Sequence, residues 1–565
     1  MKLSKYTVFY PHTNGIGVGA GDPADTGECL VYNTRTQGVL RINKEVKEFI
    51  GRVTSTQSPL FRRNTNSTNG TNPTNNSHSS HSCSPKGGCY NSDEQSCLNT
   101  LLDSGIIIDK ETDENRVMDH WFSEIKYRER PLHATILTTF KCNFACTYCF
   151  EERVKDERSM DDQTAEQVIA YLQHKAEEKK SHKIRLMFYG GEPLMNPKAV
   201  IKIATELQQW TKERGIKFSF GMITNGSLVR KELMEQLVKL GLTSIRITLD
   251  GDKAVHDSRR PFLDGRGSFE TIIRNIEEVL GDSTPVIARS GATKQSHINA
   301  GLPRAAVGAA RNDNAPAQVK VELGANFDRA NIAGLHRLLD YLEQKGLNKR
   351  ISRVLFAPVV SRLGADDKLA VDPHTNPDNK TSCCQAEKEG EGRKIYYTDS
   401  PPHQKRWCGG EDRIGVGVEP VGCHKLSGEL AEEGIKLERE LIQRGYRTPS
   451  SVKVNACPMT MDDSMLVIDP AGDIYKCEAF VGREQFCIGN VRTKRFNHRY
   501  AEFITMKPWQ AQECLECPYV PMCGGGCRYI AQLKHGDYTK PACDKEYYEK
   551  IFPQLLKMDY ERGVL

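Results

Sequence analysis

Alternation of strand-like and helix-like segments from residue 131 onward is the feature that most limits the folds open to this chain. In chain order we expect a strand over 132–140, a helix over 160–180, a strand over 183–190, a helix over 197–215, a strand over 217–226, a helix over 228–240 and a strand over 244–250. This order predicts the α/β class, with a parallel sheet that curls into a partial (β/α)6 barrel of the TIM type. Chemistry in such folds belongs at the carboxyl ends of the strands.

The rest of the chain divides around this core. In the N-terminal region, 1–125, residues 29–50 predict a hairpin followed by a helix capped by Asn43, and 96–109 predict a helix followed by a strand. We expect 54–95, rich in Asn, Ser and Thr, to be a disordered insertion because it cannot bury a core. The remaining predicted regions are a core over 130–362 with an insertion at 286–318, a linker or insertion over 363–428, and a small Cys-rich domain over 429–565.

Charge and cysteine content narrow the class of protein. The 78 basic and 73 acidic residues give a formal charge of +5, which predicts neither a nucleic-acid nor a membrane partner. We also find no apolar run of membrane-spanning length and no signal-peptide core, so we expect a cytoplasmic protein. In a large cytosolic chain, the 19 cysteines favour metal binding or catalysis over disulfides.

Three cysteines, Cys142, Cys146 and Cys149, follow the first predicted strand in the spacing C-x3-C-x2-C. Structural zinc usually has four protein ligands, and a [4Fe–4S] cluster is normally held by four thiolates. A cluster on three thiolates would have one iron open to a ligand that is not protein. From the spacing alone, a zinc site or an incidental group of cysteines is an equal alternative.

The motifs after this loop make the chain resemble the radical S-adenosylmethionine (SAM) superfamily. Tyr148 is the aromatic residue before the third cysteine, and the next three strands end in YGGEP (189–193), ITNG (223–226) and TLDG (248–251). The resemblance covers about 131–360 and the C-terminus. It implies that the open iron binds the amino and carboxylate groups of SAM. An electron then splits the C–S bond and releases a 5′-deoxyadenosyl radical, which abstracts hydrogen from an unactivated carbon.

The same resemblance implies contacts with SAM. Glu192 is expected to meet the ammonium group, and Gly190 and Gly191 to let the backbone approach the methionine end. The other expected cofactor contacts are Tyr148, Thr224, Asn225, Thr248, Asp250 and Asn326. Each motif alone is also typical of an ordinary turn or polar strand end. The fifth strand departs from the family pattern Arg-x-Asn-x-Asp, because Gly324 takes the Arg position while Asn326 and Asp328 are retained.

Seven further cysteines fit the SPASM extension of some radical SAM enzymes: Cys457, Cys477, Cys514, Cys517, Cys523, Cys527 and Cys543. The resemblance implies two auxiliary [4Fe–4S] clusters, three clusters in all. One would be held by Cys514, Cys517, Cys523 and Cys543. The other would be held by Cys457, Cys477 and Cys527, with a fourth ligand from Cys408, Cys423 or the substrate. A zinc ribbon is the alternative. Residues 468–477 predict a hairpin that turns at Ala471–Gly472 and delivers Cys477.

SPASM enzymes mostly modify peptides or proteins, so the resemblance implies such a substrate and a low-potential reductant such as flavodoxin or ferredoxin. Thioether cross-linking of a ribosomal peptide is favoured over formylglycine formation, because sulfatase maturases typically carry Asp where this chain has Glu478. Residues 29–109 would then bind the leader peptide as an added strand, or form a plain N-terminal cap. A non-catalytic iron–sulfur protein is the alternative from another class, but it would need no open iron.

Overall fold

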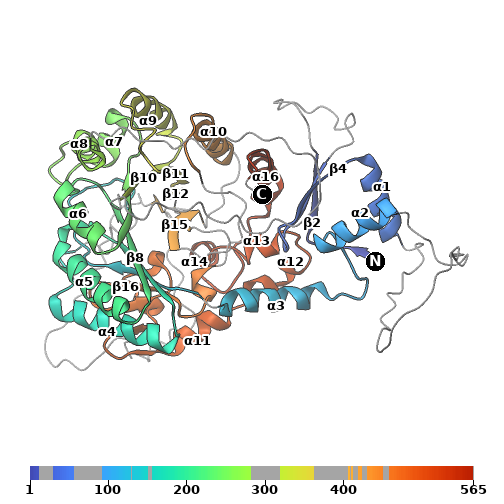
Figure 1. Cartoon of the computed structure of the whole chain (residues 1–565), viewed down its shortest axis with the longest axis horizontal. Coiled ribbons are helices and arrows are strands. Elements are labelled where there is room, and N and C mark those ends of the chain that lie inside the picture. Colours follow the sequence, from blue (N-terminus) through green and yellow to red (C-terminus); the bar gives the residue numbers. More distant parts are fainter. Residues whose placement is uncertain are drawn as a thin grey trace, which may run out of the picture. The chain divides into compact units, whose positions relative to one another are not determined.

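A computed structural model describes residues 1–11, 29–55, 92–128, 130–149, 156–281, 319–361, 405–406, 409–410, 418–422, 429–448 and 457–563. The predicted insertions at 54–95 and 286–318, the linker at 363–428, and Cys408 and Cys423 lie wholly or largely outside these residues. The chain divides into two compact units (Figure 1). We call Met1–Arg128, Ser450–Thr460 and Met506–Leu565 the terminal unit, and Glu129–Pro449 and Met461–Thr505 the core unit. These units do not follow the four regions predicted from the sequence, which stay predictions.

Six parallel strands form most of the sheet of the core unit, in the order β11-β10-β9-β8-β7-β6. The strands are β6 (Leu132–Leu137), β7 (Lys183–Tyr189), β8 (Lys217–Thr224), β9 (Leu242–Thr248), β10 (Lys320–Phe327) and β11 (Arg353–Pro358). The helices between them are α4 (Asp162–Glu178), α5 (Pro197–Glu213), α6 (Lys231–Lys239), α7 (Lys253–Arg259), α8 (Phe269–Leu280) and α9 (Ile332–Gln344). This confirms the predicted α/β class and partial (β/α)6 arrangement. Among the described strands the barrel does not close, because β6 pairs with β16 and not with β11.

The two faces of this sheet differ in polarity. Along β7, Ile184, Leu186 and Phe188 are buried, whereas the alternate residues are half-buried, as expected when successive side chains point to opposite faces. Helices α4, α5 and α6 lie along one side of the strands (Figure 1). The strands pair in register, so side chains that alternate along β7 fall into rows across the sheet. One face of the sheet is therefore apolar. The other face, which we call the polar face, bears charged side chains. There Glu322 accepts hydrogen bonds from Arg246 Nη2 at 2.9 Å and Arg353 Nη2 at 2.8 Å.

A hairpin from the C-terminal part of the chain extends this sheet. Strand β16 (Met465–Ile468) runs parallel to β6, and β17 (Asp473–Tyr475) pairs with it antiparallel. Asp469 Oδ1 accepts hydrogen bonds from the N–H groups of Ala471 at 2.8 Å and Asp473 at 2.9 Å, which closes the predicted turn. Strands β18 (Gly489–Asn490) and β19 (Arg495–Phe496) continue the sheet. The hairpin predicted around Ala471–Gly472 is therefore confirmed, and Cys477 follows it directly.

The core unit also contains helices α10 (Glu429–Gln443) and α11 (His498–Thr505). Four short strands complete the described part of this unit: β12 (Val360–Ser361), β13 (Lys405–Arg406), β14 (Gly409–Gly410) and β15 (Val418–Gly422). They form two antiparallel pairs, β12 with β13 and β14 with β15. In the described parts of both units, no helix is long and apolar enough to cross a membrane.

The terminal unit begins with a three-stranded antiparallel sheet. Its N-terminal elements are β1 (Lys2–Leu3), β2 (Thr7–Pro11), β3 (Cys29–Asn33), β4 (Val39–Ile42), α1 (Lys44–Thr54), α2 (Ser92–Asp103), β5 (Ile107–Ile108) and α3 (Glu114–Tyr127). Asn43 caps α1, since its Oδ1 accepts a hydrogen bond from Val46 N at 2.9 Å. The predicted hairpin–helix and helix–strand pairs are confirmed.

The ends of the chain share a core in the terminal unit. The C-terminal helices are α12 (Gln512–Leu515), α13 (Val520–Cys523), α14 (Arg528–His535), α15 (Lys545–Lys550) and α16 (Phe552–Glu561). Tyr10 and Tyr32 of the N-terminal sheet pack with Tyr519 and Phe552. Phe122 of α3 stacks on Trp509, with ring centroids 4.2 Å apart. The N-terminal region is therefore part of the same compact unit as the cysteines between residues 514 and 543.

Candidate functional site

The three-cysteine loop, residues 142–149, follows β6 and is paired with residues 259–263, which we call the clamp segment. Three backbone hydrogen bonds join them: Ala145 N to Pro261 O at 2.9 Å, Thr147 N to Arg259 O at 3.0 Å, and Leu263 N to Asn143 O at 3.0 Å. Phe144 and Phe262 form an antiparallel bridge between the two segments, and their rings meet edge to face at 5.0 Å. The loop is thereby held as a short added strand, and its predicted ligands Cys142, Cys146 and Cys149 are half-buried.

Two glycines after β7 allow the end of this strand to approach the end of β6. Gly190 and Gly191 have φ values of +84° and +51°, which favour glycine. A Cβ on Gly191 would overlap Lys141 O and lie 2.9 Å from Thr139 O, and a Cβ on Gly190 would overlap the Leu137 side chain. In the described structure, the two glycines therefore allow the backbone after β7 to approach the end of β6. The predicted approach to the methionine end of SAM stays a prediction.

Glu192 is a fully buried carboxyl group that joins the ends of β7 and β8. Its Oε1 accepts hydrogen bonds from Leu194 N at 3.0 Å and Thr224 Oγ1 at 2.8 Å, and its Oε2 accepts one from Asn225 N at 2.7 Å. Burial raises the pKa of Glu192, while these three hydrogen bonds oppose the rise. A carboxylate has about four acceptor positions, and these hydrogen bonds occupy three of them in a fully buried site. The predicted contact with the ammonium group stays a prediction. No feature of the GGEP motif predicted this bracing role.

Asn225 connects the end of β8 to the three-cysteine loop. Its Nδ2 donates a hydrogen bond to Asn143 Oδ1 at 2.8 Å and lies 3.9 Å from Cys142 Sγ. Asn143 in turn donates to Ser227 Oγ at 2.9 Å. A predicted cofactor contact thus lies beside a predicted cluster ligand.

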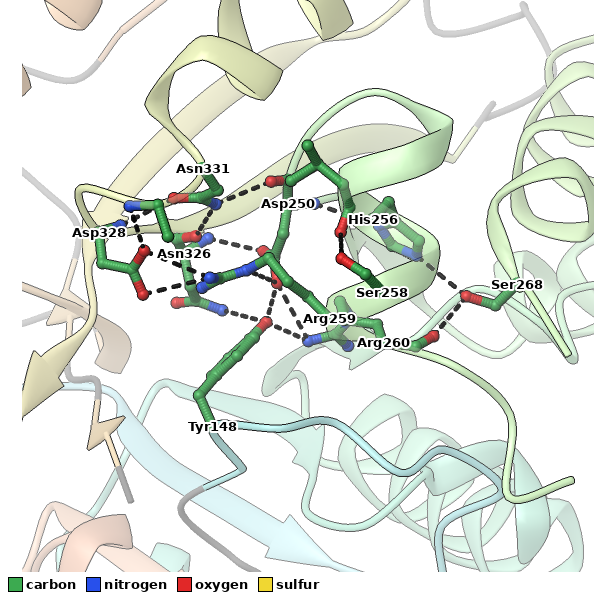
Figure 2. Close-up of polar contacts among 12 residues, drawn as sticks. Tyr148, Asp250, His256, Ser258, Arg259, Arg260, Ser268, Asn326, Asp328 and Asn331 are labelled. Atoms are coloured by element: carbon green, nitrogen blue, oxygen red, sulfur yellow. Dashed lines mark hydrogen bonds and ion pairs between the residues drawn. The ribbon is translucent and has the colours of Figure 1, made fainter. Parts of the chain in front are cut away.

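Tyr148, Asp250 and Asn326, which lie far apart in sequence, meet in one polar network (Figure 2). The Tyr148 hydroxyl donates a short hydrogen bond to Asp250 Oδ2 and accepts hydrogen bonds from Arg260 Nη1 at 2.6 Å and Asn326 Nδ2 at 3.2 Å. Asn326 N donates to Asp250 Oδ1 at 2.8 Å. Burial raises the pKa of Tyr148 well above its usual value; Arg260 opposes the rise and Asp250 adds to it. Three predicted cofactor contacts are therefore brought together at the ends of β9 and β10.

The clamp segment also supplies two arginines that our sequence reasoning missed. Arg259 Nη1 lies 3.2 Å from Asp328 Oδ2, and the Arg259 guanidinium lies 4.9 Å from the centre of the Tyr148 ring. Arg260 donates to the same tyrosine, as described above. Two consecutive arginines shortly after TLDG were the available signal, but a sequence motif does not show which loop it will pack against.

His256 lies beside this network and holds the backbone of Asp250 in place. Its Nδ1 accepts a hydrogen bond from Asp250 N at 3.2 Å, and its Nε2 lies 3.0 Å from Ser268 Oγ (Figure 2). Burial lowers the pKa of His256 well below its usual value, and the charges of Arg260 and Arg259 lower it further. The imidazole is therefore neutral near pH 7 and fixes the turn after β9.

Thr248 and Gly324 lie opposite each other on β9 and β10, and Thr248 is half-buried. A Cβ on Gly324 would lie 3.2 Å from Arg246 Cδ. The Arg246 side chain thus fills the space beside Gly324. The Arg246 guanidinium itself donates a hydrogen bond to Glu322 at 2.9 Å.

Six of the seven C-terminal cysteines lie in the terminal unit, and Cys477 lies in the core unit. Burial, Glu513, Cys517 and Cys543 raise the pKa of Cys514 to about 11, and burial, Asp544, Cys514 and Cys517 are among the causes that raise the pKa of Cys523 to about 12. Burial and Cys527 raise the pKa of Cys457. Each of these mutual effects is between cysteines that the sequence assigned to the same cluster. The predicted cluster ligands stay predictions.

Within the described ranges, no three His, Cys, Asp or Glu side chains converge closely enough to hold a single metal ion. The groups predicted from the sequence were ligands of clusters, in which each thiolate binds a different iron.

Comparisons with known proteins identify the region that carries these motifs. The model of the radical SAM superfamily matches residues 136–286, so the chain contains a radical SAM domain there, and the resemblance is confirmed. The radical SAM cyclopropyl synthase TigE of Paramaledivibacter caminithermalis is 25% identical over 214 residues, which are 35% of this chain and 44% of TigE. The serine-type anaerobic sulfatase-maturating enzyme of Klebsiella aerogenes is 30% identical over 138 residues, which are 24% of this chain and 33% of that enzyme.

The chain thus spans less than half the length of these two curated relatives. Among solved structures, native anSMEcpe with bound AdoMet aligns with a TM-score of 0.48 and 16% identity. The alignment covers 76% of this chain and 98% of that chain.

Proposed function

We propose that the protein is a radical SAM enzyme that modifies a peptide or protein. The observation that carries this proposal is the meeting of four motifs at the carboxyl ends of adjacent parallel strands. The cysteine loop follows β6, Glu192 and Asn225 join the ends of β7 and β8, and Tyr148 binds Asp250 after β9. This edge of the sheet is where α/β folds of this kind place their chemistry.

The donor set fits the cofactors that this reaction needs. Cys142, Cys146 and Cys149 would hold a [4Fe–4S] cluster through three thiolates, with SAM on the remaining iron. When bound, the cluster and SAM supply an electron and a 5′-deoxyadenosyl radical. The protein's residues position the loop, with Asn225 Nδ2 beside the sulfur of Cys142. The C-terminal cysteines would hold two auxiliary clusters, and a flavodoxin or ferredoxin would deliver the electron.

A peptide substrate is supported by two observations. The name of the sulfatase-maturating enzyme of Klebsiella aerogenes describes an enzyme that matures another protein. The antiparallel sheet β2-β3-β4 offers strand edges of the kind that bind extended peptides by main-chain pairing. We favour a thioether cross-link as the product, since Glu478 stands where sulfatase maturases typically carry Asp.

The test is to incubate the anaerobically reconstituted protein with SAM, dithionite and a cysteine-containing peptide encoded beside its gene. Thioether formation removes two hydrogen atoms from the peptide and blocks alkylation of its cysteine, which mass spectrometry detects. An unmodified peptide in the presence of released 5′-deoxyadenosine would reject that peptide as substrate and leave the SAM chemistry intact.

Formylglycine formation is a second candidate because of one specific contact. Glu478 directly follows Cys477, and its Oε1 accepts a hydrogen bond from Thr135 Oγ1 at 3.0 Å. Thr135 lies within β6, so a carboxyl group contacts the strand that leads into the three-cysteine loop. A peptide with a sulfatase-type Cys or Ser motif tests this candidate. Aldehyde formation by the wild type and its loss in Glu478→Gln would favour formylglycine over the thioether.

A further inference from the structure

Arg260 carries a buried positive charge to the three-cysteine loop. The residue is 9% exposed, and its Cζ lies 5.9 Å from the ring centres of both Phe144 and Tyr148. These two aromatic residues come two positions before and two positions after Cys146. The guanidinium is therefore held against the middle of the loop by rings on both sides of that cysteine, and by the hydrogen bond from Nη1 to the Tyr148 hydroxyl at 2.6 Å.

A second observation agrees with this placement. The backbone on both sides of Cys146 is hydrogen-bonded to the residues on both sides of Arg260: Ala145 N donates to Pro261 O at 2.9 Å, and Thr147 N donates to Arg259 O at 3.0 Å. Arg260 is therefore held opposite Cys146 in the pairing of the clamp segment with the loop.

The charged side chains around Arg260 are the second arginine of the clamp segment and the carboxylate of Asp250. Arg259, the other arginine of the clamp segment, lies between two carboxylates: its Nη1 is 3.2 Å from Asp328 Oδ2, and its Nε is 3.9 Å from Asp250 Oδ2. Arg260 faces Asp250 across the Tyr148 hydroxyl, with its Nη1 3.9 Å from Asp250 Oδ2, so its removal would leave Asp250 with one arginine, Arg259, in place of two. Removal of the Arg260 charge would therefore make the surroundings of the three cysteines more negative.

We propose that Arg260 is a positioning residue whose buried charge favours the reduced state of the cluster held by Cys142, Cys146 and Cys149. This inference rests on the proposed function. One electron from a low-potential donor enters the cluster, and no bond or proton is exchanged in this step. The added negative charge is stabilised by a fixed cation in a site of low dielectric constant. Arg260 thus makes easier the electron uptake that precedes SAM cleavage.

The experiment is an EPR-monitored redox titration of the full, anaerobically reconstituted chain. The signal that changes on addition of SAM distinguishes the open-iron cluster from the auxiliary clusters. We compare Arg260→Met, which removes the charge, with Arg260→Lys, which keeps it. Arg246→Met is a matched control, because it removes a buried cation paired with Glu322 on β9, roughly 13 Å along the strand from Asp250.

We expect Arg260→Met to lower the reduction equilibrium constant of that cluster at least tenfold, which is about 59 mV for one electron. Arg260→Lys and Arg246→Met should stay within about threefold of the wild type. An unshifted potential in Arg260→Met overturns the inference. Loss of the cluster's iron in both Arg260 variants also overturns it, because the need would then be structural. Loss of the cluster's iron in Arg260→Met but not in Arg260→Lys supports the inference, because the cluster then depends on the positive charge.

The wild-type chain separates this inference from the proposed function. A wild type without a SAM-dependent signal overturns both. A wild type with that signal, together with an unshifted Arg260→Met, overturns only the role of Arg260.

Discussion

Replacing Gly191 with alanine tests whether the three-cysteine loop depends on close packing between the ends of β6 and β7. An alanine at φ +51° costs about 1–2 kcal/mol because the left-handed conformation crowds its Cβ. The Cβ would also overlap Lys141 O, a backbone atom next to Cys142, and overpacking of this kind typically costs about 1–3 kcal/mol more. We therefore expect the free energy of unfolding to fall by about 2–5 kcal/mol, or the loop to move.

Gly215→Ala is the matched control. Gly215 has φ +66°, but its Cβ would have no neighbour within 4 Å. It should therefore lose only the conformational cost of about 1–2 kcal/mol. Urea unfolding measures both costs, and iron per reconstituted chain measures whether the loop still binds its cluster.

We expect Gly191→Ala to lose about four irons per chain, the content of one [4Fe–4S] cluster, and Gly215→Ala to lose none. If Gly191→Ala kept its full iron content and was no less stable than Gly215→Ala, the packing described between Gly191 and Lys141 would be wrong.

Three further predictions concern stability. Phe122→Ala removes the ring stacked on Trp509 and should lower the free energy of unfolding by about 3–5 kcal/mol; a loss under about 1 kcal/mol in urea unfolding would contradict the shared core. Tyr148→Phe removes the hydroxyl bound by three side chains and should cost about 1–3 kcal/mol in the same assay, whereas the exposed Tyr127→Phe should cost almost nothing. Burial, with a smaller effect of Asp473, raises the pKa of Asp469 to about 7. The stability this buried carboxyl contributes is therefore full below its unfolded pKa near 4 and is lost as pH rises through about 7. Asp469→Asn cannot ionise, so it should gain stability relative to the wild type between about pH 5 and pH 8, and a pH-independent difference would contradict this.

Local features of the fold were predictable because their causes lie within a few residues. The Asn43 cap and the Ala471–Gly472 turn each depend on side chain or backbone groups close in sequence. The strand predicted over 132–140 was too long, since β6 ends at Leu137. Thr139 instead forms an isolated bridge with Ser159, a contact that strand periodicity does not encode.

Contacts between distant segments account for what the sequence did not predict. The pairing of the three-cysteine loop with the clamp segment uses backbone groups, which are the same in every sequence. The stack of Phe122 on Trp509 joins the two ends of the chain, and either residue alone reads as an ordinary helix core position. Glu192 was recognised as a motif residue, but its motif does not show that Thr224 and Asn225 bind both of its oxygens. The site residues were thus found, and their mutual support was not.

The central claim is that Cys142, Cys146 and Cys149 hold the cluster at which SAM is cleaved. The most direct test measures iron per chain and 5′-deoxyadenosine release under reduction, for the reconstituted wild type and for the Cys142/Cys146/Cys149→Ala triple variant. We predict about twelve irons and release of 5′-deoxyadenosine for the wild type, against about eight irons and no release for the variant. Zinc in place of iron, or equal release from both proteins, would contradict the claim.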